Sequence, residues 1–296
     1  MDDKELESYR KAGKVAKDTL EWASKLVKPG VKLLEVCERI EGRLEREGAG
    51  SAFPVNISLN DAAAHYTPRS GDETVFGAQD VVKLDIGVHV DGYIADTATT
   101  IDLSGKYGRM LDANRKALDE AIAIARPGVS VSTIGETVQA VLLEAGYRPI
   151  ENLTGHELKQ YDLHAGLSVP NIKVPYDWRL REGMVLAFEP FATDGAGHVI
   201  ESRGAEIYSL VSERPVRMKE ARMLLDLVGD RREMPFAVRW YADKIPPLKI
   251  GLVLNQLTRA GILKAYPPLH DKDKGIVSQF EHTLIVTGEG CEVITK

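Results

Sequence analysis

The 296-residue chain is 44% hydrophobic, which is enough for a sizeable core in one large domain or two smaller ones. Its 38 basic and 44 acidic residues give a net charge of -6, which excludes the overall basic footprint of a nucleic-acid-binding protein. No apolar run approaches the roughly 18 residues of a membrane span and no signal peptide is visible, so we expect a soluble cytoplasmic protein without a membrane partner. Cys37 and Cys291 lie far apart and outside any zinc spacing, which predicts two free thiols.

The chain begins with two expected helices. Residues 1–27 have a helical pattern, and residues 29–48 read as a Pro-Gly loop followed by an amphipathic helix that Gly48 ends. A segment with His65 (AAAHYTP) comes next, and then a hydrophobic strand that contains Asp85 (VVKLDIG). Because an unpaired buried carboxylate is costly, Asp85 must have a partner.

Residues 81–90 and 93–102 read as the two strands of a hairpin. Asp91-Gly92 between them predicts a two-residue turn, since such turns need a positive φ at their central residues. One face of the hairpin is then an apolar core face, formed by Leu84, Ile86, Val88, Val90, Tyr93 and Ala95.

The other face of the hairpin carries two acids. The register places Asp85 opposite Ala98 and Asp96 opposite Gly87, so the carboxylates are diagonal neighbours with Cβ atoms roughly 7–8 Å apart or less. Two close carboxylates resist ionising together. A shared proton, a basic residue or a metal must therefore offset their charge.

After a helix at 110–125, the chain repeats its own beginning. Residues 127–146 (PGVSVSTIGETVQAVLLEAG) resemble residues 29–48 (PGVKLLEVCERIEGRLEREG) at an offset of 98 residues. The second copy is also followed by a histidine, His164 (YDLHAGL), and by an acid in a hydrophobic strand, Glu189 (MVLAFEP). We expect a single α/β (α+β) domain over 1–296, made of two halves related by a pseudo-twofold axis, with acids from both halves meeting near the axis.

The last third of the chain combines two further strands, at 184–192 and 279–287, with a segment of different character between them. Residues 213–270 contain helix-patterned stretches and clustered charges, so they read as a helical insertion into the domain. The segment faintly resembles a winged-helix module that binds nucleic acid, but a structural insertion without specific nucleic-acid binding is the favoured interpretation.

Four acids in strand-like surroundings and one histidine in an expected loop or helix start (NLTGHEL) form a candidate site. They are Asp85, Asp96, Glu189, Glu281 and His156. Oxygen ligands with one imidazole suit Mn, Fe, Co or Zn, and paired metals are a known hydrolytic device. An aspartic protease would need a second loop to match ADTA (95–98), a glycosidase would leave most of these residues unexplained, and calcium would prefer a compact Asp/Asn loop.

Several motifs together resemble the methionine aminopeptidases of type 2. They are FPVNISLNDAAAHYTP, KLDIGVHVDGYIADTATT, NLTGHELKQYDLHAGLSVPN, VLAFEPFATDGAG and SQFEHTLIV. Residues 213–270 resemble the helical insertion that separates type 2 from type 1, and the lack of a long charged N-terminal extension resembles the archaeal form. The resemblance covers nearly the whole chain and implies the pita-bread fold, a curved and mainly antiparallel sheet covered by helices.

The resemblance also implies a centre with two divalent metal ions (Co, Mn, Fe or Zn). Asp96 and Glu281 would bridge both ions, Asp85 would chelate one of them, and His156 with Glu189 would bind the other. A water molecule between the ions would be the nucleophile, and Glu189 would be its general base.

Substrate contacts are implied in the same way. His164 would contact the scissile carbonyl or amide, and His65 the departing side, so both count as catalytic and substrate-binding residues. Phe53, Leu163 and Tyr266 would form an apolar pocket for a methionine side chain. His89, His198, His270 and His282 are read as ordinary hydrogen-bonding residues.

The implied function is removal of the initiator methionine when the second residue is small. Substrates would be peptides with N-terminal methionine and nascent chains, with the ribosome as a candidate partner and a monomer as the expected state. Xaa-Pro dipeptidase and aminopeptidase P share the metal site and are the alternative, although they usually carry a further N-terminal domain. A non-enzymatic binding protein that acts through 213–270 is the other alternative.

Overall fold

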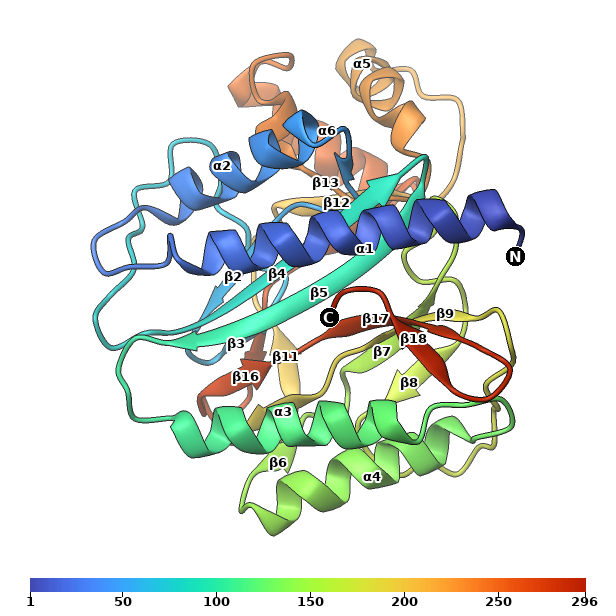
Figure 1. Cartoon of the computed structure of the whole chain (residues 1–296). Helices are drawn as coiled ribbons and strands as arrows, with labels where there is room; N and C mark the ends of the chain where they lie inside the picture. Colours follow the sequence, from blue (N-terminus) through green and yellow to red (C-terminus); the bar gives the residue numbers. More distant parts are fainter.

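The computed structural model describes residues 1–296, with the exception of the side chain of Pro247, and consists of a curved sheet system with helices on its outer side (Figure 1). The helices are α1 (Asp3–Ser24), α2 (Leu33–Arg46), α3 (Gly108–Ala123), α4 (Val131–Glu144), α5 (Lys219–Val228) and α6 (Pro247–Arg259), with short 3-10 turns η1 (Gly229–Arg231) and η2 (Val238–Tyr241). The strands of the first half are β1 (Gly50–Ser51), β2 (Asn56–Leu59), β3 (Ala62–Ala64), β4 (Val81–Val90) and β5 (Tyr93–Asp102). The remaining strands are β6 (Arg148–Pro149), β7 (Thr154–Leu158), β8 (Ser168–Pro170), β9 (Val185–Phe188), β10 (Phe191–Thr193), β11 (Val199–Glu201), β12 (Ile207–Leu210), β13 (Phe236–Ala237), β14 (Leu263–Tyr266), β15 (Leu269–Asp271), β16 (Val277–Gln279), β17 (His282–Val286) and β18 (Cys291–Val293).

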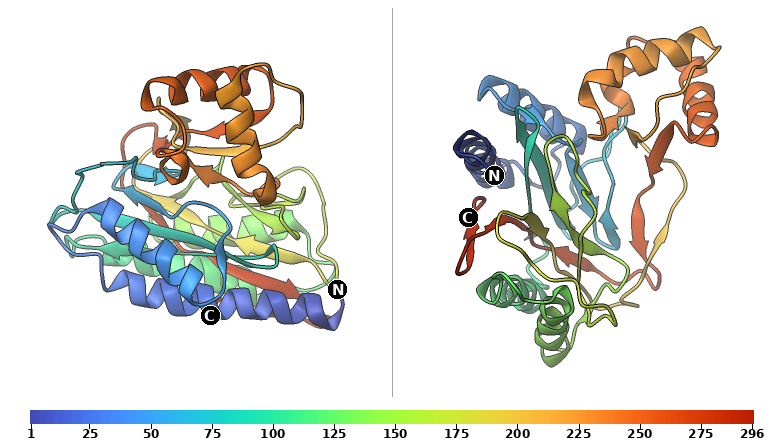
Figure 2. Two further views of the ribbon diagram at one scale, coloured as in Figure 1. Left: turned by 90° about the horizontal axis from the view of Figure 1, so that it is seen from above. Right: turned by 90° about the vertical axis from the view of Figure 1, so that its right-hand side faces the viewer.

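The four helices expected in the first half of the chain are confirmed, with ends that differ by a few residues. The first begins at a capping box, in which the Glu5 N–H donates to the Asp2 carboxylate and the Asp2 N–H donates to the Glu5 carboxylate, each at 2.8 Å. In Figure 2, α1 and α2 cover one half of the sheet system and α3 and α4 cover the other half.

The repeat seen in the sequence is also a repeat of backbone hydrogen bonds. Gly30 donates its N–H to the Phe76 carbonyl at 2.8 Å, and Gly128 donates in the same way to the Leu180 carbonyl at 2.9 Å. Both glycines have a φ of 85°, a backbone conformation that residues with a side chain rarely adopt. The same loop therefore leads into α2 and α4, which confirms two related halves.

The predicted hairpin is confirmed residue by residue. β4 and β5 pair in antiparallel register with Asp85 opposite Ala98 and Asp96 opposite Gly87. Both central residues of the turn have positive φ, as the Asp-Gly dipeptide indicates. The register follows from local turn chemistry, so it could be read before any tertiary contact was known.

The two halves meet where β5 runs beside β17. Ala98 forms an antiparallel bridge with Glu281, the Asp96 N–H donates to the Thr283 hydroxyl at 2.7 Å, and the Gln279 N–H donates to the Thr100 hydroxyl at 2.8 Å. These contacts join β5 of the first half to β16, β17 and the residues between them in the second half. Acids from both halves are thereby brought to one place.

The strands predicted at 184–192 and 279–287 are wrong as continuous strands. The first is broken between β9 and β10 at Glu189, and the second between β16 and β17 at Glu281. β9 pairs with β17, whereas β10 pairs with β16 in a different sheet. Pro190 has no N–H for a ladder, so the chain changes sheets there and Glu189 lies between the two strands. Glu281 lies between β16 and β17 and pairs with Ala98 in an isolated bridge.

Residues 213–270 contain α5, α6, both 3-10 turns, β13 and β14. They form most of a separate hydrophobic cluster around Leu224, Phe236 and Leu257. In Figure 1 this part of the chain lies at the top, above α2. The structure is consistent with an insertion that has its own small core, and the division of the chain into a catalytic domain with an insertion stays a prediction.

Cys37 and Cys291 are free thiols, as predicted. Within the part of the chain that the structure describes, the helices are all too short or too polar to cross a membrane.

Candidate active site

A cavity of about 220 Å³ opens on the carboxylate-bearing face of the hairpin. The five expected metal ligands all line it: Asp85, Asp96, His156, Glu189 and Glu281. They come from β4, β5, β7, the break after β9 and the break before β17. Both halves of the repeat therefore contribute to one site.

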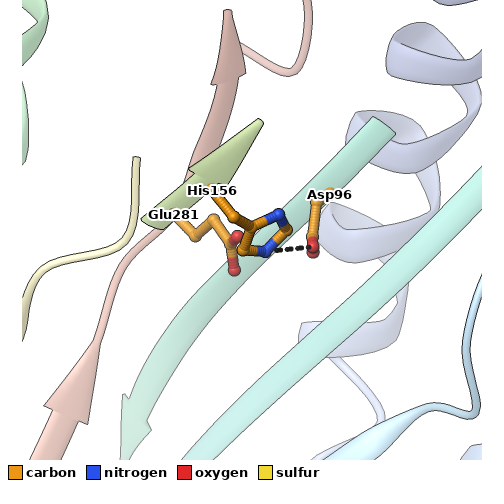
Figure 3. A group of neighbouring side chains, drawn as sticks. All are labelled: Asp96, His156 and Glu281. Atoms are coloured by element: carbon orange, nitrogen blue, oxygen red, sulfur yellow. Dashed lines mark ion pairs between the residues drawn. The ribbon is translucent and has the colours of Figure 1, made fainter. Parts of the chain in front are cut away.

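Three of these residues are especially close. One ligand atom from each of Asp96, His156 and Glu281 lies within 4.8 Å of the others, and Figure 3 shows the three side chains converging. The His156 Nε2 atom is 3.6 Å from Asp96 Oδ2 and 3.5 Å from Glu189 Oε1. Asp85 lines the same cavity but is not part of the closest group.

The expectation that His156 lies in a loop or helix start is wrong, because the residue lies in β7. This strand pairs with β8 and β9, and Gly155 allows the close approach, since a Cβ there would collide with the Ala187 carbonyl. Pairing with distant strands decided this conformation.

Gln279 is a site residue that the sequence reasoning missed. Its Nε2 atom donates to Glu281 at 3.2 Å, to Asp85 at 3.4 Å and to Glu189 at 3.5 Å. The available signal was its position two residues before Glu281, the spacing at which strand residues share a face.

Burial dominates the electrostatics of the four acids. It raises the pKa of Asp85 to about 7. It also raises the pKa values of Asp96, Glu189 and Glu281 well above their usual range, and for these three repulsion from neighbouring carboxylates is a further cause. Of the described basic residues, only His156 forms ion-pair contacts with them. Its own pKa is well below the usual value because of burial first and His164 second, so it is neutral near pH 7. A basic residue therefore does not offset the charge, which leaves protons or a metal.

The donor atoms fit a divalent cation. Asp85 Oδ1, Asp96 Oδ1 and Glu281 Oε1 are buried without a hydrogen-bond partner among the described residues. Buried polar atoms are almost always paired, so a group of unpaired acceptors around one cavity points to a missing partner. Several carboxylate oxygens with one neutral imidazole are the donors that divalent transition metals accept.

Two further histidines form one wall of the cavity. His65 has a φ of 65° and meets Tyr266 edge-on with ring centroids 5.6 Å apart, while His164 lies 4.5 Å from His156 between ring centroids. Burial, followed by His164, lowers the pKa of His65 to about 4, and burial, followed by Lys264, lowers the pKa of His164 to about 4. Both rings are therefore neutral hydrogen-bonding groups near pH 7.

The three residues expected to form an apolar pocket also lie at the cavity. Phe53, Leu163 and Tyr266 line the cavity, and the structure adds Asn56, Ile207 and Pro235, which the sequence did not single out. Gly87 leaves room for the Phe53 ring, because a Cβ there would overlap it. Among the described residues that line the cavity, the histidines are His65, His156 and His164, while the four other histidines lie elsewhere.

Comparisons with known proteins agree with this geometry. Residues 7–288 match Metallopeptidase family M24. A protein of Pyrococcus abyssi named methionine aminopeptidase is 47% identical over 99% of this chain and 100% of its own length, and one of Archaeoglobus fulgidus with the same name is 47% identical over 100% of both chains.

Solved structures show the same fold at lower sequence identity. A methionine aminopeptidase of Thermotoga maritima covers 100% of this chain and 98% of its own, with a TM-score of 0.74 and 21% identity. A thermophilic Arx1 covers 99% of this chain and 91% of its own, with a TM-score of 0.87 and 19% identity. A prolidase of Pyrococcus furiosus has a TM-score of 0.64 and 17% identity, and only 64% of that longer chain is covered.

Proposed function

Because the chain belongs to metallopeptidase family M24, we propose that its cavity removes the N-terminal methionine from peptides whose second residue is small. The observation that carries this proposal is the buried group of Asp96, His156 and Glu281, which lines a cavity with several apolar residues. Among the described residues, the group has no basic ion-pair partner besides the histidine itself. Full-length relatives named methionine aminopeptidase support the substrate class over that of the prolidases.

The family and the donor atoms support the use of divalent metal, and we propose two ions. Asp96 and Glu281 would hold both ions, His156 and Glu189 would complete the site of one, and Asp85 that of the other. The contacts of His156 with Asp96 and Glu189 support this division. When bound, the ions would polarise the scissile carbonyl and lower the pKa of a water molecule toward 7.

The protein's own side chains would transfer the proton and orient the substrate. Glu189 lines the cavity beside Asp85, and its carboxylate would take a proton from water and pass it to the leaving amine. His65 and His164 are neutral and can donate hydrogen bonds to the amide that is cleaved.

The cavity walls would select the substrate. Phe53, Leu163 and Tyr266 offer an apolar surface to the unbranched, flexible methionine side chain. His65 and His164 would crowd the second side chain of the substrate. Peptides that begin Met-Gly, Met-Ala, Met-Thr or Met-Val should therefore be cleaved, and Met-Lys or Met-Phe peptides poorly.

The test compares four peptides on protein reconstituted with Mn²⁺ or Co²⁺, with product analysis and kcat/KM for each. We expect rapid release of methionine from Met-Ala-Ser, slower cleavage of norleucine-Ala-Ser and almost none of Lys-Ala-Ser, because one methylene in an apolar pocket is worth only about 1–3 kcal/mol. Cleavage of Ala-Pro-Ala in preference to Met-Ala-Ser would favour the Xaa-Pro alternative. Comparable values for the Met and Lys peptides would contradict the pocket.

The roles assigned to His65, His164 and the pocket residues belong to this proposal. The monomeric state, the ribosome as a partner for nascent chains and the cytoplasmic location stay predictions.

A further inference from the structure

An arginine of the 213–270 segment, which is not among the residues that line the cavity, contacts the first half of the molecule. The Arg239 side chain, in η2, is 4% exposed and pairs with Glu41 of α2. Its other terminal nitrogen donates to the Thr67 hydroxyl at 2.6 Å and to the Pro68 carbonyl at 3.1 Å. The planar guanidinium reaches these partners from two separate nitrogens, whereas an ammonium presents all its donors from one nitrogen.

The next residue strengthens the same contact. The Trp240 Nε1–H donates to the second carboxylate oxygen of Glu41 at 2.9 Å, so both oxygens of Glu41 are held by the 213–270 segment. We call Arg239, Trp240 and Glu41 the clamp.

The clamp reaches the loop that carries a site histidine. Thr67 lies two residues after His65, and its hydroxyl donates in turn to the Val55 carbonyl at 2.8 Å. His65 itself has a positive φ, a conformation that persists in a non-glycine residue only when its surroundings hold it. The bonds from Arg239 are among those surroundings.

The 213–270 segment also supplies part of the cavity wall. Pro235 and Tyr266 line the cavity, and the Tyr266 ring is in edge contact with His65. The distance between the His65 loop and these two residues thus depends on how residues 213–270 pack against the rest of the molecule.

We propose that Arg239 is a positioning residue for the hydrolysis: bound to Glu41, it holds the 213–270 segment and the His65 loop in one fixed arrangement. The inference rests on the proposed function. A displacement of about 1 Å far from the chemistry can cost up to about a hundredfold in rate, so loss of the clamp should be visible in catalysis without any loss of metal ligands.

The experiment uses the full-length, metal-loaded protein and four variants. In Arg239→Met the side chain keeps its apolar stem but loses all three contacts, and in Glu41→Gln the ion pair is removed from the other side. Arg239→Lys retains the positive charge but lacks the planar guanidinium group. Arg214→Met is the matched control, since Arg214 is exposed and, among the described residues, its side chain donates hydrogen bonds to Ser212, directly before the segment, and to Ala260 within it.

We expect kcat/KM on Met-Ala-Ser to fall by about ten- to a hundredfold in Arg239→Met and Glu41→Gln. The ratio of kcat/KM for Met-Ala-Ser to that for Met-Val-Ser should change as well, because in the proposed function His65 would lie beside the second residue of the substrate. Metal affinity, measured by calorimetry, should stay within about twofold of the wild type, as expected for a distant site. Hydrogen exchange should accelerate at 65–69, while Arg214→Met behaves as the wild type.

The Arg239→Lys variant tests whether the guanidinium geometry or the positive charge alone is required. Low kcat/KM in folded Arg239→Lys supports the proposal, and full recovery of kcat/KM and of the substrate ratio overturns it. A lowered melting temperature in Arg239→Met with unchanged kcat, substrate ratio and exchange at 65–69 would show a merely structural role and would also overturn it. If the wild type itself fails to release methionine, the proposed function is at fault instead.

Discussion

At the scale of single residues, burial determines the protonation of the side chains in the site. Asp85, Asp96, Glu189 and Glu281 are kept together at the cost of raised pKa values, and the three histidines around them are kept neutral. Such a group is stable near neutral pH only with protons or a cation among the carboxylates. Removal of one side chain should therefore have different effects depending on whether it would hold a metal or only touch the substrate.

The proposed bridging acids should matter most for metal loading. Asp96→Ala and Glu281→Ala should each lose more bound metal per chain than Asp85→Ala, because a bridging carboxylate serves both ions and a terminal one serves a single ion. Metal counts by elemental analysis after equilibration with Mn²⁺ would test the order. Greater loss in Asp85→Ala than in the other two would contradict the assignment.

His164 should behave as a substrate contact. His164→Ala should retain metal but lose on the order of 10²–10³ in kcat/KM, as expected when a positioned hydrogen-bonding group near the reacting amide is removed. The comparison is His156→Ala, which should lose both metal and activity. Equal metal loss in the two variants would show that His164 had been misassigned.

His89 offers a test of pH dependence outside the site. Burial first and Arg231 second lower its folded-state pKa to about 4, below the ordinary value of 6.5. The unfolded chain thus binds more protons between these values, so the stabilisation is complete above pH 6.5 and is lost as pH falls toward 4. His89→Gln should lose less thermal stability than the metal-free wild type between pH 7 and 4.5. His198→Gln is the control. If the melting temperatures of all three proteins depended on pH in the same way, His89 would not contribute to the loss of stability at low pH.

At the scale of elements, the β4–β5 hairpin and the two interrupted strands create the cavity. The hairpin places its acids on one face through a two-residue turn, while the breaks at Glu189 and Glu281 let two acids of the second half leave their ladders. The space beside the acids depends on a missing side chain in β4.

Gly87→Ala tests this space. The added Cβ would overlap the Phe53 ring, so Phe53 should be pushed into the methionine pocket and the variant should be destabilised by about 1–3 kcal/mol. KM for Met-Ala-Ser should rise more than kcat falls. Gly108→Ala, where an added Cβ meets no atom within 4 Å, is the control. An unchanged KM in a folded Gly87→Ala protein would remove Phe53 from the pocket wall.

At the scale of the whole molecule, two halves of one chain share a single site. The acids belong to both halves, and one wall of the cavity comes from residues 213–270. Metal bound between the halves should therefore stabilise the folded protein as well as support hydrolysis.

Chelator treatment should abolish methionine release and lower the melting temperature, and Mn²⁺, Co²⁺ or Fe²⁺ should restore both. A ligand at a hundred times its Kd adds about 2.7 kcal/mol to the free energy of unfolding, which calorimetry can detect. The Asp96→Ala variant should show little response to added metal. Full activity in a metal-stripped sample would contradict metal-dependent hydrolysis.

The sequence by itself determined the features that depend on neighbours along the chain. The Asp91-Gly92 turn and the period of two along a strand were enough to put Asp85 and Asp96 on one face, and the repeated Pro-Gly loop was enough to predict two related halves. Local backbone preferences and alternation of side chains act over a few residues, so a sequence displays them directly.

Only the tertiary structure decided the features that join distant segments. It put His156 in a strand, broke two strands at Glu189 and Glu281, and turned the Gln279 amide toward three of the acids. It also joined Arg239 to Glu41 across almost two hundred residues. Such contacts depend on which strands pair and how a segment is seated, and these are settled by long-range packing and burial that no local pattern encodes.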